Sequence, residues 1–128
     1  MARIILDSSA LLAILNSGDA NHEVMVEHLQ GRTDQFSIST ITLVETLIHA
    51  YRQSAKAGQR YKTSIDHAIK EIFPVDEEVA LEAAIFRART DIRTPDAIIS
   101  ATATLTGAEL WTCDQKLAKA HKGVVLIS

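Results

Sequence analysis

Residues 3–12, RIILDSSALL, join a short apolar run to the start of a helix through one carboxylate, Asp7. The apolar residues 4–6 are typical of a buried strand, and the leucines at positions 11, 12 and 15 have helical spacing. A buried strand that leads directly into a helix opens a βα unit of a parallel sheet. Ligands of open α/β sheets bind just beyond the carboxyl ends of the strands, so Asp7 lies where such folds keep their chemistry.

Strand and helix patterns alternate along the rest of the chain, which predicts one domain over residues 1–128, built as a parallel α/β sandwich. Gly58 and Gly107 are expected to end helices, and Thr94 to cap one that begins at Pro95. Pro74 favours an edge position for its strand. We expect strands at 2–6, 35–39, 73–75, 109–112 and 124–127, and helices at 9–16, 22–30, 41–57, 60–71, 77–90, 95–106 and 115–121.

The composition is that of a globular chain, with 47% hydrophobic and 23% charged residues. Its formal charge of −3 argues against nucleic-acid binding by bulk positive charge, so any such contact must be local or carried by a bound metal. The single cysteine, Cys113, allows no internal disulfide. No signal peptide or membrane span is predicted, and we expect a cytoplasmic protein.

Four acids are positioned to meet at one edge of the predicted sheet. Asp7 and Asp114 follow strands, Glu45 lies about one turn into the helix after the second strand, and Asp96 is near the start of another helix. The carboxyl ends of parallel strands share an edge, and oxygen-only ligands suit Mg²⁺ or Mn²⁺. Such an ion activates water and clamps phosphate oxygens.

Each of these acids also has a purely structural explanation. Asp7 and Asp114 can cap the helices that follow them, and Asp96 can complement a helix dipole. Glu45 can close a capping box with Thr42, although it borders the apolar stripe of its helix. Asp76 also follows a strand, but Glu77 and Glu78 beside it make an ordinary acidic first turn. We therefore leave Asp76 out of the candidate site.

Four motifs resemble those of PIN-domain ribonucleases in order and spacing over essentially the whole chain. They are IILDSS at 4–9, LVE at 43–45, RTPDAIISATA at 93–103 and LWTCD at 110–114. The third is the most specific. Cys113 stands where the family commonly has asparagine, and Leu117 where an aromatic is common. The length is similar to that of VapC-type toxins of bacterial and archaeal toxin–antitoxin pairs.

The resemblance implies a three-layer fold, a central parallel sheet of four to five strands flanked by helices, and a metal-dependent endoribonuclease. Asp7 and Asp96 would be the main ligands of one or two Mg²⁺ or Mn²⁺ ions. Glu45 would hold the metal or orient the water, and Asp114 would complete the cluster. The resemblance also implies a homodimer and a small antitoxin protein as partner. Ser9 and Thr112 could hydrogen-bond these ligands or the RNA, or act only as local caps.

Cationic residues suggest where RNA would lie. Residues 46–65 contain four Lys or Arg and no acid, with Tyr51 and Tyr61 between them. Arg89 and Arg93 lie just before the helix that carries Asp96 and are candidate phosphate contacts. The alternative is an ordinary solvated surface with cations at helix ends. His49 lies four residues after Glu45, but we expect a surface histidine there and find no zinc pattern.

Other functions remain open on the sequence alone. A PIN fold that only binds RNA or protein is one, although all four acids are present. A phosphatase of the HAD type would need a second aspartate where Ser9 stands, and a signalling receiver would need an acidic pair after the first strand.

Overall fold

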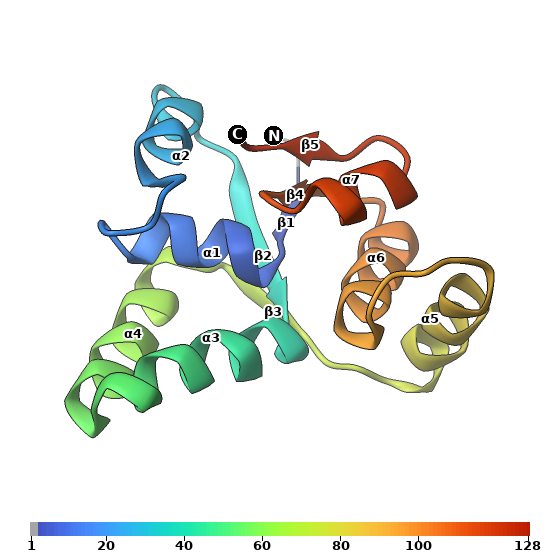
Figure 1. Ribbon diagram of the computed structural model, residues 1–128, viewed down its shortest axis with the longest axis horizontal. Coiled ribbons are helices and arrows are strands. Elements are labelled where there is room, and N and C mark those ends of the chain that lie inside the picture. The colour runs from blue at the N-terminus through green and yellow to red at the C-terminus, as the bar shows by residue number, and fades with distance from the viewer. Residues whose placement is uncertain (1–2) are drawn as a thin grey trace.

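The computed structural model describes residues 3–128, and its centre is a parallel sheet of five strands in the order β3-β2-β1-β4-β5 (Figure 1). All four strand pairings are parallel. The strands are β1 (Arg3–Leu6), β2 (Gln35–Ser39), β3 (Glu71–Phe73), β4 (Glu109–Thr112) and β5 (Val125–Leu126). The helices are α1 (Ser8–Leu15), α2 (His22–Leu29), α3 (Thr40–Gln53), α4 (Ala55–Ala68), α5 (Glu77–Arg89), α6 (Thr94–Thr106) and α7 (Gln115–Ala120).

β1 is the central strand, and its side chains divide between two cores. Ile4 and Leu6 belong to a cluster with residues of α1, α2 and α4, whereas Ile5 belongs to a cluster with residues of α5, α6 and α7. Successive strand residues point to opposite faces of a sheet, so both faces must be covered. Figure 1 shows α1–α4 on one side of the sheet and α5–α7 on the other. The predicted three-layer α/β sandwich is confirmed.

The predicted end of the third helix was wrong. Gly58 lies inside α4 and is buried, and the chain instead breaks at Ser54, whose side chain accepts a hydrogen bond of 2.9 Å from the Ala57 amide. A Cβ at position 58 would lie 2.3 Å from Cε1 of Tyr51. Glycine is therefore used here for a close approach between α3 and α4, not to end a helix.

The bounds of β3 and the start of α6 also differ from the prediction. β3 comprises residues 71–73, so Pro74 follows the strand, which does lie at the sheet edge. The N-cap position of α6 is Arg93, and Thr94 is the first helical residue. Gly107 ends α6 as predicted, with a φ of 71° that glycine adopts without strain.

Among residues 3–128, no helix combines the length and the apolar character needed to cross a membrane.

Candidate metal centre at the carboxyl edge of the sheet

Asp7 lies where β1 ends, and its carboxylate is held by hydrogen bonds from three directions. Oδ1 accepts from the Ala10 amide at 2.8 Å, which caps α1, and from Ser9 Oγ at 2.7 Å. Oδ2 accepts from the hydroxyl of Thr112 at the end of the neighbouring strand β4. Asp7 is only 3% exposed, so this carboxylate is both buried and fixed in orientation.

Burial raises the pKa of Asp7 from its ordinary 3.8 to about 6. The hydrogen bonds from Thr112, Ala10 and Ser9 favour the ionised form and oppose this rise, and the nearby charge of Asp96 adds to it. The position of Asp7 thus lacks a positive charge to balance the carboxylate.

Asp96 reaches the same place from the first turn of α6. Thr94 and Pro95 begin the helix there, and Asp96 is buried, at 7% exposed. Its burial raises the pKa of the carboxyl, the Arg93 guanidinium lowers it, and the charges of Asp114 and Glu45 raise it. The acids influence one another electrostatically, which means that α6 and the strand ends bring them together.

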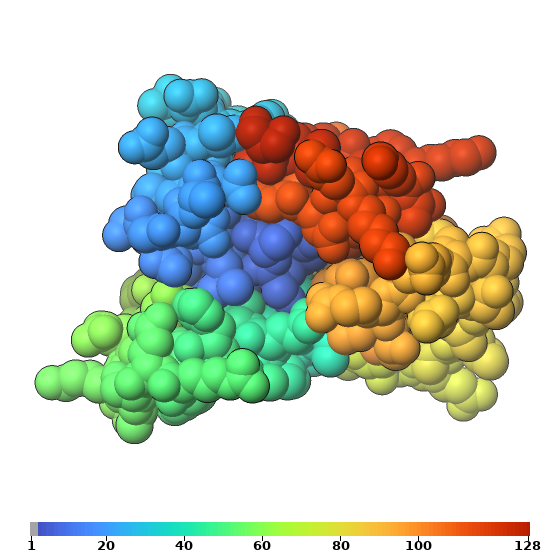
Figure 2. Space-filling model, in the orientation of Figure 1, coloured from blue at the N-terminus to red at the C-terminus, as the bar shows by residue number. Residues whose placement is uncertain are grey.

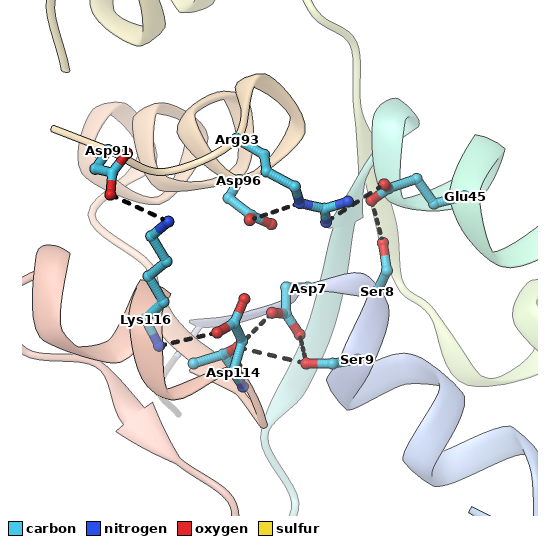
Figure 3. A network of polar contacts seen from close by, with 10 residues as sticks. Asp7, Ser8, Ser9, Glu45, Asp91, Arg93, Asp96, Asp114 and Lys116 are labelled. Carbon is cyan, nitrogen blue, oxygen red and sulfur yellow. Dashed lines mark hydrogen bonds and ion pairs between the residues drawn. The ribbon is translucent and has the colours of Figure 1, made fainter. Parts of the chain in front are cut away.

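Glu45 faces this cluster from α3. Its Oε1 accepts a hydrogen bond of 2.6 Å from Ser8 Oγ, at the start of α1. The capping box with Thr42 does not form, because Ser39 caps α3 and the buried Thr42 hydroxyl has no hydrogen-bond partner among residues 3–128. Glu45 therefore has no capping role, and Figure 3 shows its carboxylate on the other side of the Arg93 guanidinium from Asp96.

Arg93 lies between two of the acids (Figure 3). Its Nε is 3.4 Å from Oδ2 of Asp96, and its Nη2 is 3.8 Å from Oε2 of Glu45. The charge of Asp96 is the largest cause that raises the pKa of this guanidinium. Its side chain is two-thirds exposed, at 67%, so the pairing is loose and solvated.

Asp114 enters from the turn after β4. Its Oδ1 accepts from the Lys116 amide at 2.9 Å and so caps α7, while its own amide donates to Thr112 Oγ1 at 2.9 Å. Lys116 extends away from it toward Asp91, with Nζ 3.4 Å from Oδ2 (Figure 3). Thr112 therefore links the two strand-end acids, Asp7 and Asp114, through one hydroxyl.

The structure brings the four predicted acids to one edge of the sheet and gives Ser9 and Thr112 a definite place beside them. Both hydroxyls contact Asp7, and Thr112 is fully buried. Ser9 Oγ also accepts from the Cys113 amide at 2.9 Å. Both side chains hold a candidate ligand, whereas contact with RNA stays a prediction. Sequence reasoning missed Ser8, whose only signal was its position beside Asp7.

The predicted cationic residues divide between separate places. Arg93 and Arg52 line one hollow with Glu45, His49 and Ile48 along α3. Lys56 and Arg60 line a different hollow on α4. Arg89, at the end of α5, lies away from the acids and lines a cavity between α5, α6 and the end of α7. The basic stretch therefore does not form a single surface.

Asp76, which we left out of the site, caps α5 by accepting from the Val79 amide at 2.9 Å. It lies at the edge strand β3, away from the central strands. Asp7 and Asp114 have this capping role too, so the structural explanation is confirmed for both, and their role as metal ligands stays a prediction.

The donor set fits a divalent cation of the Mg²⁺ type. It consists of carboxylate oxygens, two of the acids are buried, and Arg93 is the cation that faces them. Within residues 3–128, no three acidic, histidine or cysteine side chains already converge at metal-binding distance. Figure 2 shows the blue N-terminal segment recessed between green α3 and orange α6 and α7.

Solved structures of similar fold cover nearly the whole chain. A toxin–antitoxin complex from Klebsiella pneumoniae is 27% identical, with a TM-score of 0.80 and 98% of both chains covered. FitAcB from Neisseria gonorrhoeae is 23% identical, with a TM-score of 0.76 and 96% of both chains covered. VapC20 from Mycobacterium tuberculosis, described as a Sarcin-Ricin loop cleaving toxin, is 20% identical, with a TM-score of 0.79 and 91% and 94% covered.

No curated protein sequence shows significant similarity to the chain. The family model of the PIN domain matches residues 4–123, which include the four acids, both hydroxyls that contact Asp7, and β1 from Ile4 onward. The sequence motifs predicted this family, and the match covers all of them. The chain belongs to the PIN domain family.

Proposed function

We propose that this protein is a metal-dependent endoribonuclease and the toxin of a type II toxin–antitoxin pair. The observation that carries the proposal is the group of four acids at the carboxyl edge of a PIN fold, with Asp7 buried and its pKa raised to about 6. Burying a carboxylate without a balancing charge is unfavourable. A divalent cation at this position supplies that charge.

Asp7 and Asp96 are the main metal ligands in this proposal, with Asp114 completing the cluster. Glu45 holds the metal or orients the attacking water, and Ser8 fixes its carboxylate at 2.6 Å. Mg²⁺ is the expected ion, and Mn²⁺ is expected to support activity as well. Bound there, the ion activates water and stabilises the charge that develops on the phosphate.

The side chains around the acids have supporting roles. Ser9 and Thr112 hold the Asp7 carboxylate in one orientation through hydrogen bonds to both of its oxygens. Arg93 is exposed and lies beside two acids, where it can exchange those pairings for an RNA phosphate. The positive charge of Arg93 reduces the repulsion between the negative cluster and the RNA phosphates.

The partners follow from the neighbours. Several solved structures of the same fold are toxin–antitoxin complexes, including the Klebsiella complex at 27% identity. We propose a small antitoxin protein as partner, a homodimer as the toxin's own state, and a cytoplasmic location, where RNA substrates are available. The HAD-like phosphatase and receiver alternatives do not agree with membership of the PIN family.

Cleavage of a mixed RNA pool with Mg²⁺ or Mn²⁺ tests the proposal, with EDTA as the metal-free control. Wild type is compared with Asp96→Asn and with Asp76→Asn, which makes the same change at a surface N-cap. We expect metal-dependent cutting by wild type and D76N, and none by a D96N protein that melts cooperatively. Equal cutting by D96N would contradict the site. No cutting of a broad RNA set by wild type would favour a PIN fold kept for binding alone.

A further inference from the structure

A cavity of about 470 Å³ lies on the α5–α7 side of the sheet, outside the carboxylate cluster. It opens between α5, α6 and the end of α7, which lie together on one side of the molecule in Figure 1. In Figure 2 the surface is hollowed between the red C-terminal segment and the yellow end of α5. Its volume is within the range of small-molecule sites, about 300–1,000 Å³.

The lining combines positive charge with an aromatic ring. Arg89 and Lys122 contribute permanent positive charges against one carboxylate, Glu82, and Phe86 contributes the ring. Arg89 and Lys122 make no ion pair with any residue in the described range 3–128. Both side chains are therefore available to an anionic ligand.

A buried hydroxyl–imidazole pair forms part of the wall. Ser100 is only 3% exposed, and its Oγ lies 2.5 Å from Nδ1 of His121. This contact fixes the imidazole ring while Nε2 has no hydrogen-bond partner among the described residues. Burial lowers the pKa of His121, so the ring is neutral at pH 7 and can hydrogen-bond a ligand without adding charge.

The cavity is connected to the carboxylate cluster by two helices. Ser100 follows Asp96 by one turn of α6, a rise of about 6 Å. His121 follows Asp114 along α7 by seven residues, about 10 Å. The Lys116–Asp91 pair joins the start of α7 to the segment between α5 and α6, and both of its side chains are more than half exposed. An extended strand that leaves the acids in this direction reaches the cavity within its next nucleotides.

We propose that this cavity binds one nucleotide of the RNA strand a short distance along the strand from the scissile phosphate, with the base against Phe86 and the phosphate on Arg89 and Lys122. The assignment rests on the proposed ribonuclease function. Proteins recognise single-stranded RNA by stacking unpaired bases on aromatic rings, and cationic side chains hold the backbone. The cavity gives both kinds of contact within one enclosure.

The first test is direct binding of nucleoside 5′-monophosphates to the intact protein in EDTA, read from the imidazole proton signals of His121. A His121→Gln variant assigns those signals. We expect a saturable shift with the monophosphates and weaker binding of the nucleosides and of inorganic phosphate. A silent His121 signal would overturn the proposal. Phosphate that binds as tightly as the nucleotides would overturn the role of the base.

Two variants locate the site. Thr104 is exposed on the cavity wall, so Thr104→Trp fills the space without entering the core, and Arg89→Ala with Lys122→Ala removes both charges. The matched control, Arg87→Ala with Lys119→Ala, removes the same charge from the same ends of α5 and α7. Neither control residue lines the cavity. We expect Thr104→Trp and the Arg89/Lys122 variant to abolish the His121 shift. The Arg87/Lys119 control should retain it.

The same variants are then measured for binding of a single-stranded RNA in EDTA. Losing the one phosphate that Arg89 and Lys122 would hold reduces the salt slope by about 0.7, the value for one phosphate on a single strand. An unchanged slope in the Arg89/Lys122 variant, or an equal fall in the control, would refute the assignment. A protein that binds nucleotides here but cuts no RNA would contradict only the proposed function. An active nuclease with a silent His121 would contradict only this inference.

Discussion

Replacing Asp7 by asparagine is expected to stabilise the metal-free protein at neutral and alkaline pH. The carboxyl pKa is about 6 in the folded protein and 3.8 in the ordinary state, because burial disfavours the charge. Above pH 6 the folded protein must ionise a buried group that the unfolded chain ionises in water. At about 1.4 kcal/mol for each pH unit, this difference destabilises the folded state by about 3 kcal/mol.

The sign of the pH dependence follows from proton binding. Between pH 3.8 and about 6 the folded state binds more protons than the unfolded state, so stability falls as the pH rises. Below this range both states are protonated, and above it the loss is complete. Asparagine does not titrate. The advantage of D7N over wild type should therefore grow by about 2 kcal/mol between about pH 4.5 and about pH 8.

Urea unfolding of both proteins in EDTA across this pH range measures the difference, provided that the m values agree. Asn can keep the acceptor for the Ala10 amide and turn its Nδ2 toward Thr112, so the local contacts survive. Asp76→Asn is the control for the same replacement at a surface N-cap. A D7N difference that is constant with pH would show that the Asp7 carboxyl is not desolvated in the way the structure indicates.

Three other predictions concern the metal, Arg93 and the α3–α4 contact. Mn²⁺ should raise the Tm of wild type more at pH 8 than at pH 5.5, because its ligands must be ionised, and should leave D7N nearly unchanged in a thermal melt. Arg93→Ala should bind Mn²⁺ more tightly than wild type in calorimetry without RNA, because the substitution removes a competing cation. The same variant should bind RNA more weakly. Equal Mn²⁺ affinity of the two proteins would refute this competition. Gly58→Ala should lower the free energy of unfolding by about 1–3 kcal/mol through its clash with Tyr51, and Tyr51→Ala should relieve the loss in a double-mutant cycle.

The position of the acids was largely predictable because parallel strands end at a common edge. Asp7 and Asp114 follow β1 and β4, which the structure places side by side. The residues alone did not determine that these two strands are neighbours. Pairing order depends on contacts between residues 105 positions apart, such as Thr112 and Asp7, which leave no local pattern.

The predicted helix caps were correct where a polar side chain and the amide that it caps are close in the sequence. The predictions of helix starts and ends were wrong where tertiary packing determined the role of a residue. Ser39 is the N-cap of α3, so the spacing of Thr42 and Glu45 has no capping role. Thr42 lies instead on the buried face of the helix. Gly58 read as a helix end, but the contact with Tyr51 from the preceding helix is what requires a residue without a side chain. Neither outcome could be read from spacing alone.

The arrangement of the site explains why its hydroxyls and its arginine belong with the acids. Ser9 and Thr112 favour the ionised form of Asp7, but burial outweighs them. Arg93 lowers the pKa of Asp96, yet burial and the other acids outweigh that too. These contacts thus hold the carboxylates in place without balancing all of their negative charge. In the proposed ribonuclease, a divalent cation held by these acids would supply the missing positive charge and would attract a phosphate that carboxylates alone would repel.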